Sequence, residues 1–367
     1  MSKILFTAGP IPTRLDSVKY LTNRFRGGLA VATAEKLQSM GHQVTLVAWK
    51  YADLKTTLPI IRVEDVHDYY KTVLATQADA YVLAAAVANL GPLSPLPGKF
   101  PSHNYRVGDV FPIDFTIMPR VVDELKNAYP TATLIAYKLF DGSDEELVAA
   151  AQKTLFESRA NLVFANHPQW AKERKIAVTA DGAAFGISFD DHVDLMDRLI
   201  RAAFYRTEVR NAALPRLGEE DAFIIEHYPK HKQAGMTFGT FAIRTAQGFF
   251  TTTRGKKAGE KEVAFVYNVD HAERVVHANK KATLNAPLLH ALLERNPHIH
   301  FLIHSHELIG DLVQQDYQFP GTDGDLLNAL STKEPYFLIQ LPHHGYIAGF
   351  SDFSSCKKFI LSHGHVG

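Results

Sequence analysis

The chain has 367 residues, of which 46% are hydrophobic, and it carries 39 basic and 39 acidic side chains. This length allows two or three globular domains, each with its own core. The balanced charge gives no sign of a basic surface for nucleic acid or of an acidic disordered tail, so we expect small-molecule partners and neither nucleic acid nor a membrane.

Cys356 is the one cysteine, which excludes an intrachain disulfide framework and favours a reducing compartment. The first residues enter a short apolar strand without the pattern of a signal peptide. No apolar run approaches the roughly 18 residues that span a bilayer. We therefore expect a cytoplasmic protein.

The first fifty residues predict a βαβ unit. A strand at 4–7 is followed by a Gly- and Arg-rich loop, a helix at 29–40 that Gly41 ends, and a strand at 43–49. Such a unit has an opening of nucleotide size at the end of its first strand. The loop carries neither G-x-G-x-x-G nor a P-loop motif, so a different nucleotide chemistry is implied.

The remainder of the first half alternates strand and helix signals, which favours a doubly wound, mostly parallel sheet with helices on both faces. We expect strands at 80–87, 133–137 and 161–165, an edge strand at 175–179, and helices at 119–128, 143–158 and 191–206. Ser143 and Glu146 form a capping-box pattern at the start of the second of these helices.

A segment with Pro215 and Gly218 marks the predicted domain boundary, which gives domains at 1–212 and 213–367. Strands are expected at 238–244, 248–253, 263–269, 300–304 and 336–341, with a helix at 286–295. Strands that outnumber helices indicate a smaller α/β domain with a mixed or antiparallel sheet.

Several basic residues lie in the loop before the first helix, among them Arg14, Lys19, Arg24 and Arg26. Backbone N–H groups and the dipole at a helix N-terminus favour an anion, and arginine adds bidentate contacts to phosphate. The alternative is a solvated basic loop without a ligand.

Ordered motifs in residues 3–205 resemble the phosphopantothenoylcysteine synthetase family, the ligase half of the bacterial coenzyme A biosynthetic flavoprotein. The matching segments are Thr7-Ala8-Gly9, 16–24 (DSVKYLTNR) with Gly27-Gly28, Ala84-Ala85-Ala86-Val87-Ala88-Asn89, Lys99, Ile135-Ala136-Tyr137, Ala165-Asn166 and Phe185-Gly186.

The resemblance implies a ligase that uses CTP and Mg²⁺ to convert a carboxylate into an acyl-cytidylate, which an amine attacks to give an amide. It implies catalytic roles for Asn23 and Lys99, the amide holding acyl-phosphate oxygens and the amine neutralising charge on the leaving group. The residues implied in nucleotide binding are Gly9, Arg24, Ala86, Asn89, Tyr137, Asn166 and Phe185.

Three positions differ from the family pattern. Asn89 replaces an aspartate expected near the nucleotide base, Phe25-Arg26 replaces Ser-Ser, and Lys99 begins K-F-P-S where the family has K-x-K-K. We therefore expect an acid other than phosphopantothenate, and the choice of CTP over another nucleotide stays open.

In the segment 298–306 (HIHFLIHSH), a strand would place His298, His300, His304 and His306 on one face and Ile299, Phe301 and Ile303 on the other. Such a row can chelate one metal ion, with a third ligand from His343-His344. The alternative is a set of half-exposed histidines without metal.

Residues 215–360 resemble the class II aldolase/adducin family. The matching segments are 239–244 (GTFAIR), 249–255 (FFTTTRG), 284–290 (LNAPLLH), 295–306 (RNPHIHFLIHSH) and 343–345 (HHG). The resemblance implies zinc bound by His304, His306 and His344. Ala286 stands at the position of the family's catalytic glutamate, which Glu294 or Glu307 could replace.

Three hypotheses follow. The first is a nucleotide-dependent carboxylate–amine ligase fused to a zinc-binding, aldolase-like domain. The second is a metal-dependent lyase or dehydratase whose first domain only binds a nucleotide-linked or phosphorylated substrate. The third is a scaffold without catalysis. Both resemblances imply a homo-oligomer.

Overall fold

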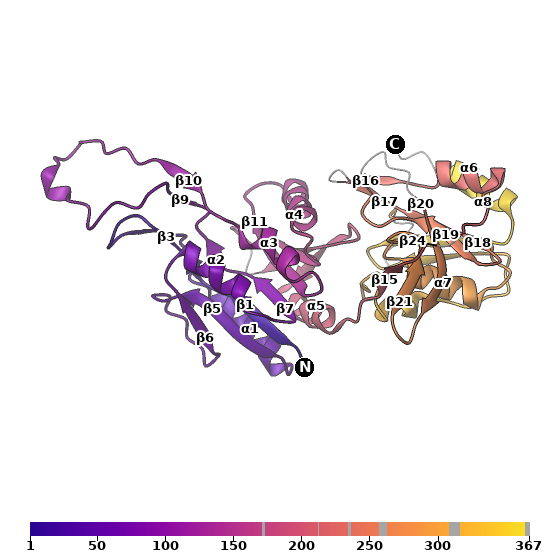
Figure 1. The fold of residues 1–367 in the computed structure, drawn as a ribbon, viewed down its shortest axis with the longest axis horizontal. Helices are drawn as coiled ribbons and strands as arrows, with labels where there is room; N and C mark the ends of the chain where they lie inside the picture. The colour runs from indigo at the N-terminus through magenta and orange to yellow at the C-terminus, as the bar shows by residue number, and fades with distance from the viewer. Residues whose placement is uncertain (171–172, 212, 234–235, 257–262, 308–315, 364–367) are drawn as a thin grey trace. The chain divides into compact units, whose positions relative to one another are not determined.

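The computed structural model describes residues 1–170, 173–211, 213–233, 236–256, 263–307 and 316–363. The chain forms two compact units, each treated separately below (Figure 1). The first comprises Met1–Ala180 and Phe185–Arg201, and the second comprises Asp181–Ala184 and Ala202–Gly367. None of the described helices is long and apolar enough to cross a bilayer.

The first unit is built on a large, mostly parallel sheet in the order β14-β13-β12-β11-β7-β1-β5-β6. Every pair from β12 to β6 is parallel, and β13 runs antiparallel to β12. The strands are β1 (Lys3–Thr7), β5 (Gln43–Trp49), β6 (Ile60–Val63), β7 (Ala80–Leu83), β11 (Thr133–Leu139), β12 (Leu162–Asn166), β13 (Arg174–Thr179) and β14 (Ala184–Ser188).

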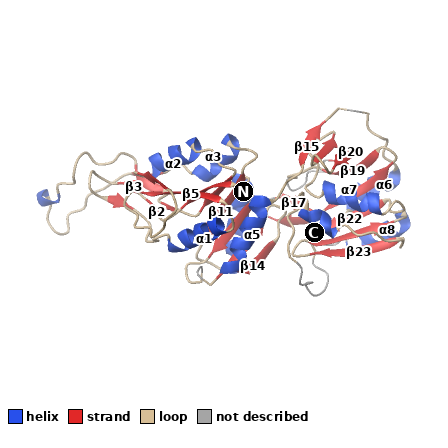
Figure 2. Ribbon diagram, turned by 90° about the horizontal axis from the view of Figure 1, so that it is seen from below, coloured by secondary structure: helices blue, strands red, loops and turns tan. Residues whose placement is uncertain are grey.

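Helices cover both faces of this sheet, as the alternating pattern predicts (Figure 2). One face carries α1 (Gly28–Ser39) and α5 (Phe189–Arg201), and the other carries α2 (Val66–Ala75), α3 (Val121–Ala128) and α4 (Asp144–Ser158). The capping box of α4 is confirmed, since Ser143 and Glu146 exchange hydrogen bonds. The α/β, doubly wound fold class is therefore confirmed.

Short strands extend the first unit beyond its main sheet. They are β2 (Pro10–Ile11) paired with β8 (Ala86–Val87), β3 (Thr13–Arg14) with β4 (Tyr20–Leu21), and β9 (Leu90–Pro92) with β10 (Phe115–Ile117). The last pair forms the base of a long arm, residues 93–114, which contains a 3-10 turn at Ser102–Asn104 (Figure 1).

The second unit contains a mixed sheet in the order β15-β21-β20-β19-β18-β22-β24-β23, parallel only between β15 and β21. Its strands are β15 (Arg206–Val209), β18 (Thr240–Thr245), β19 (Gly248–Thr252), β20 (Val263–Asp270), β21 (Val275–Ala278), β22 (Phe301–Ser305), β23 (Tyr336–Leu341) and β24 (Gly345–Phe350), and a separate hairpin pairs β16 (His231–Gln233) with β17 (Met236–Phe238).

Two apolar cores lie on opposite faces of this second sheet. One packs under α7 (Ala286–Arg295) and the 3-10 turn Gly324–Asn328. The other packs under α6 (Glu219–His227) and α8 (Phe353–His363), where Cys356 is fully buried. The second unit is therefore also a three-layer α/β structure.

Four sequence expectations need correction. The strand expected at 80–87 ends at Leu83, because residues 86–87 pair with β2 instead. The strand at 175–179 is not an edge strand, since β14 lies outside it. The strand expected at 238–244 is interrupted at Gly239, which has φ +92°.

The fourth correction concerns the helix expected at 191–206. It ends at Arg201, because the backbone beyond it is engaged elsewhere. The N–H of Tyr205 donates to the Gly321 carbonyl, and the N–H of Arg206, the first residue of β15, donates to the Arg274 carbonyl. The two compact units divide after Arg201.

Candidate functional sites

The first helix begins against the end of β1 through two glycines. Gly9 and Gly27 both have positive φ, and a Cβ added to Gly27 would lie 2.6 Å from the Gly9 Cα atom. Only glycine allows this contact without displacing backbone. No acidic residue occupies the first turn of α1, so its N-terminal N–H groups are favourable for an anion.

Asn23 lies beside this turn. Its amide nitrogen donates to the Ala86 carbonyl over 3.0 Å, and the Ala86 N–H donates to the Gly9 carbonyl over 2.9 Å. Three of the predicted site residues, Gly9, Asn23 and Ala86, therefore form one hydrogen-bonded group at the carboxyl end of β1. This edge is where doubly wound folds bind ligands.

The segment that carries Lys99 is anchored to the same loop by Asp16. The Asp16 carboxylate is fully buried and accepts hydrogen bonds from the N–H groups of Val18, Lys19 and Phe100 and from Lys19 Nζ. Burial alone would raise the pKa of this carboxyl, but the hydrogen bonds from Lys19 and the backbone hold it well below its usual value. Lys99 itself is exposed, next to an anchored backbone.

Arg24 and Asn89 are predicted site residues that are exposed in the structure. Arg24 lies over the Phe25 ring at 5.8 Å. The Asn89 carbonyl accepts a hydrogen bond from Met118 N–H, which fixes the base of the arm. These two predictions stay untested.

A second group forms at the carboxyl ends of β11 and β12. Asn166 Oδ1 accepts a hydrogen bond from Lys175 Nζ over 3.1 Å, and that amine lies 5.8 Å from the Tyr137 ring centroid. Burial raises the pKa of Tyr137, so its hydroxyl stays neutral. Phe185 lies half-buried on β14. The sequence reasoning missed Lys175, whose burial depends on contacts with distant segments.

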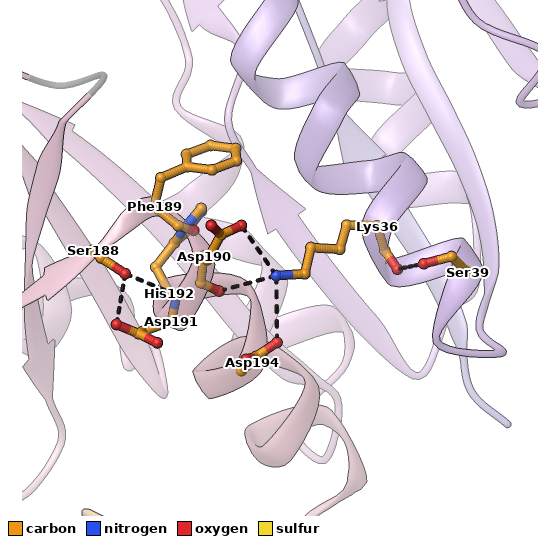
Figure 3. Close-up of polar contacts among 8 residues, drawn as sticks. All are labelled: Lys36, Ser39, Ser188, Phe189, Asp190, Asp191, His192 and Asp194. Atoms are coloured by element: carbon orange, nitrogen blue, oxygen red, sulfur yellow. Dashed lines mark hydrogen bonds and ion pairs between the residues drawn. The ribbon is translucent and has the colours of Figure 1, made fainter.

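The start of α5 adds His192 to this second group. Its ring lies 6.5 Å from that of Tyr137 and 5.1 Å from that of Phe164. Burial lowers the pKa of His192 to about 4, so the ring is neutral at pH 7. In Figure 3 its ring lies beside Phe189, while Lys36 of α1 reaches Asp190 and Asp194 instead.

In the second unit, His304, His306 and His344 converge. Their candidate ligand atoms all lie within 4.8 Å of one another, and among the described residues this is the group of three or more side chains suited to a metal ion. His304 is on β22, His306 follows that strand, and His344 is in the turn between β23 and β24. His298 and His300, by contrast, lie before β22 and outside the cluster.

A glycine brings the turn that carries His344 close to β22. Gly345 has φ +84°, and a Cβ placed on it would lie 1.9 Å from the Ser305 carbonyl oxygen. Any side chain here would push the turn away from β22. The H-H-G sequence therefore has a structural reason for its glycine.

The orientation of these imidazoles suits a metal. His304 Nδ1 bonds to the Tyr346 carbonyl over 2.9 Å, which requires a proton on Nδ1 and leaves Nε2 with a lone pair. Nε2 of His304 is buried without a hydrogen-bond partner in the described part of the chain, and the buried Nε2 of His344 lies 3.2 Å from an Asp181 carboxylate oxygen without hydrogen-bond geometry. Burial keeps the pKa values of all three rings below 6.5, so they are neutral. Neutral imidazoles with unused lone pairs fit Zn²⁺.

Two further ionisable groups surround the histidine cluster. An Asp181 carboxylate oxygen, assigned to this second unit, lies 3.2 Å from His344 Nε2. Lys256 is buried, donates to the Gly239 carbonyl over 2.7 Å, and contributes charge to His304 and His306. Burial first, then the charge of Lys230, lowers the pKa of Lys256 to about 7. The sequence reasoning missed both residues.

Neither of the expected replacements for the missing glutamate joins the cluster. Ala286 is fully buried at the start of α7, and Glu294 on that helix acts electrostatically on His271 and His290. The Glu307 N–H bonds to Ser305 Oγ, and its carboxylate affects the pKa of Tyr346. Lys256 is the better candidate for proton transfer.

Curated relatives match the first unit. The chain is 30% identical over 169 residues to the coenzyme A biosynthesis bifunctional protein CoaBC of Thermococcus kodakarensis, which covers 45% of this chain and 41% of the relative. It is 34% identical over 93 residues to the CoaBC of Vibrio parahaemolyticus, covering 24% of this chain and 23% of the relative. The chain thus spans about two fifths or less of the length of these relatives.

Among solved structures, the DNA/pantothenate metabolism flavoprotein from Streptococcus pneumoniae is similar over 53% of this chain and 96% of its own, at 22% identity and a TM-score of 0.47. YgbL of Klebsiella pneumoniae, a putative aldolase/epimerase/decarboxylase, is similar over 40% of this chain and 84% of its own, at 13% identity and a TM-score of 0.29. The second similarity is too low to assign a family to the second unit.

The family model described as "DNA/pantothenate metabolism flavoprotein C-terminal domain" matches residues 1–197, which is more than half of the chain. The match covers β1 to α5, including both groups of predicted nucleotide-site residues. On this evidence the chain belongs to the DNA/pantothenate metabolism flavoprotein C-terminal domain family.

Proposed function

We propose that the first unit is a nucleotide-dependent ligase that activates a carboxylate for amide formation, with CTP as the nucleotide to test first. The observation that carries the proposal is the group formed by Gly9, Asn23 and Ala86 at the carboxyl end of β1, beside the N-terminus of α1. Membership of the family and the names of the CoaBC relatives support it.

In the proposed reaction, a carboxylate oxygen attacks the α-phosphorus of the nucleotide and the bond to the β-phosphate oxygen breaks, releasing pyrophosphate. An amine nitrogen then attacks the acyl carbon, the bond to the nucleoside monophosphate breaks, and the amine loses a proton. Asn23 donates to oxygens of the acyl phosphate and Lys99 neutralises charge on the leaving group. Mg²⁺ accompanies the triphosphate, whose oxygens supply most of its ligands.

The test is release of pyrophosphate from CTP, Mg²⁺ and a panel of carboxylic acids and amines, with ATP, GTP and UTP in parallel. Asn23→Ala should lower kcat/KM by about 10²–10³-fold, as is typical when a donor to a developing oxyanion is removed. Asn127→Ala, an exposed amide on α3, is the control. A protein that binds none of these nucleotides at millimolar concentration would sink the proposal.

The departures at Asn89 and Phe25-Arg26 enter the same test. Aspartate at position 89 restores the family residue, so Asn89→Asp should shift the preference among nucleotides if position 89 contacts the base or ribose. An unchanged preference would place base selection elsewhere. We also propose, from the departures, that the acid is not phosphopantothenate.

A second candidate function concerns the second unit, where three neutral imidazoles converge and the buried His304 Nε2 has no hydrogen-bond partner among the described residues. We propose that His304, His306 and His344 bind Zn²⁺, which when bound would act as a Lewis acid for lyase or dehydratase chemistry. Lys256 would hold or move a proton beside that ion. Metal analysis of the purified protein tests the zinc site, and a zinc content well below one ion per chain would favour the scaffold hypothesis.

A homo-oligomer remains part of the proposal. The arm and its base expose large apolar side chains, and these are Leu90, Leu93, Tyr105, Val107, Val110, Phe111, Phe115 and Ile117. An exposed apolar patch of this kind is typical of a protein–protein contact. Analytical ultracentrifugation of the chain, before and after substitution of Val107 and Ile117 by serine, tests whether the arm forms that contact.

A further inference from the structure

Lys175 occupies a defined place at the carboxyl edge of the first sheet. β12 and β13 are antiparallel with Ala165 opposite Ile176, so the next residues along, Asn166 and Lys175, face each other at the end of the ladder. Lys175 is 3% exposed and Asn166 8% exposed. A lysine this deeply buried is uncommon, and burial of its ammonium group needs a reason.

The contact between these two side chains fixes the orientation of an amide. A lysine ammonium group has donors and no acceptor, so it must face the Asn166 oxygen, at 3.1 Å. The amide nitrogen is then turned away from Lys175. A fixed amide nitrogen is a hydrogen-bond donor for an acceptor atom of a ligand.

Two aromatic rings and a neutral imidazole lie near the lysine. Its Nζ lies 5.8 Å from the Tyr137 ring centroid and 6.0 Å from that of Phe189. His192 is fully buried, its Nδ1 bonds to the Phe189 carbonyl, and its Nε2 has no hydrogen-bond partner among the described residues. A buried ring nitrogen with an unused lone pair is a second indication that a polar group is received here.

Three acidic side chains of the neighbouring helices have partners of their own. On α5, Asp190 pairs with Lys36 and Asp191 accepts from Ser188, as Figure 3 shows. On α4, against the opposite face of the sheet, Asp144 pairs with Arg174. β14 carries no ionisable side chain, and Tyr137 and His192 are neutral at pH 7.

We propose that Lys175 is a positioning residue of the nucleotide site, which holds the Asn166 amide so that its nitrogen donates to an acceptor atom of the bound nucleotide. The inference rests on the proposed function of the first unit. Burial lowers the pKa of Lys175 to about 8. Above that pH the neutral amine accepts as well as donates, so the amide is no longer held in one orientation.

The experiment measures binding of CTP with Mg²⁺ by calorimetry between pH 6.5 and 9.5. Wild-type affinity should fall several-fold as the pH rises through about 8, and Lys175→Met should bind about tenfold more weakly at pH 7 with no such fall, a loss in the range of one hydrogen bond. Lys153→Met, an exposed lysine on α4, is the control and should match the wild type. Equal affinity and an equal pH profile for Lys175→Met would overturn the inference.

Two further variants keep the test decisive if Lys175→Met fails to fold. Lys175→Arg should restore binding but remain insensitive to pH in this range, since arginine stays charged. Asn166→Asp keeps a partner for Lys175 but has no amide donor, so it should lose about as much affinity as Lys175→Met. Unchanged binding by Asn166→Asp would also overturn the inference. A wild type that binds no nucleotide is a distinct result, which overturns the proposed function itself.

Discussion

The two candidate sites differ in what holds their residues in place. In the second unit, His304, His306 and His344 lie on or next to adjacent strands, so the register of the sheet fixes their separation before any ligand arrives. In the first unit, Asn23 and Lys99 lie on loops that are held by hydrogen bonds to other loops, Asn23 to Ala86 and the segment around Lys99 to residues 15–17. The first arrangement suits an ion and the second suits a large substrate that must enter and leave.

Both sites nevertheless contain the same unusual element, a buried lysine near neutral histidine. Lys175 faces Asn166 near His192. Lys256 donates to the carbonyl of Gly239, and the next residue, Thr240, pairs with His304 in the sheet. Burial lowers both amine pKa values, to about 8 and about 7. Each amine is therefore close to its titration range at physiological pH, where proton transfer is most effective.

The largest expected effect is on metal binding by the second unit. His304→Ala removes one of three nitrogens and should lower zinc affinity by more than about 10²-fold, since loss of an outer partner of a ligand alone costs 10–100-fold. Competition with a chromogenic chelator measures this affinity. His298→Ala, whose ring bonds to Glu334 outside the cluster, should retain full affinity.

The same variant sharpens the comparison between the sites. CTP binding should be unchanged in His304→Ala, because the proposed nucleotide contacts all lie in the first unit. A joint loss of zinc and nucleotide binding would show that the two sites depend on each other. It would then contradict a division of function between the units.

The next effect is a difference in how the two units respond to pH. In the second unit, burial raises the pKa of Asp325 to about 7, against hydrogen bonds from Gly321 and Asn328 that lower it. The folded unit therefore keeps the Asp325 proton that the unfolded chain loses near pH 4, and the stability that Asp325 contributes falls as the pH rises from about 4 to 7, by roughly 2–4 kcal/mol. Asp325→Asn should remove this dependence of stability on pH. Urea unfolding measures the stability at each pH, with hydrogen exchange of the amides of residues 316–329 as the readout for the second unit.

Asp16 in the first unit should respond in the opposite direction. Its folded pKa is lowered, so the stability it contributes is present above about pH 4 and is lost as the pH falls below that value. Acidification from pH 7 to pH 4 should thus increase the stability that Asp325 contributes and leave the contribution of Asp16 unchanged, while the buried histidines of the second unit, whose pKa values are lowered, act against Asp325. Each contribution is the difference in unfolding free energy between the wild type and Asp325→Asn or Asp16→Asn, and equal pH profiles of the two differences would contradict both assignments.

The sequence predicted correctly the helices and strands whose apolar pattern has clear local ends. The strand Gln43–Trp49, the helix Ala286–Arg295 and the strand Tyr336–Leu341 have the expected bounds. α2, α6 and α8 were missed, although α2 has an Asp65 N-cap that a search for helix starts could have found. The helix that was expected to reach Arg206 was too long because tertiary pairing of β15, not a local stop signal, ends it.

The two sites were predictable to different degrees for a physical reason. Alternation placed four histidines on one face, and the structure brings two of them, His304 and His306, together with His344, while His298 and His300 lie before the strand. The importance of Lys175 and Lys256 comes from burial, which depends on contacts with distant segments. Neither residue differs locally from a surface lysine.

The smallest of these effects tests whether close backbone contact, rather than loop sequence alone, shapes the nucleotide edge of the first unit. Gly27→Ala should lower the free energy of unfolding of that unit by about 2–3 kcal/mol, because the new Cβ combines a positive φ with a 2.6 Å approach to Gly9. Gly98→Ala is the matched control, since Gly98 also has positive φ but nothing within 4 Å of an added Cβ, and it should cost only about 1–2 kcal/mol.

Tryptophan fluorescence during urea unfolding reads this difference in the first unit alone, because Trp49 and Trp170 are the only tryptophans and both belong to that unit. Equal losses in the two variants would mean that α1 can move away from β1 at little cost. The anion-binding geometry at its N-terminus would then not be preformed, and the nucleotide itself would have to bring Gly9 and Gly27 together. In that case the loss of nucleotide affinity in Gly27→Ala should not exceed its loss of unfolding free energy relative to the wild type, at about tenfold in affinity for each 1.4 kcal/mol.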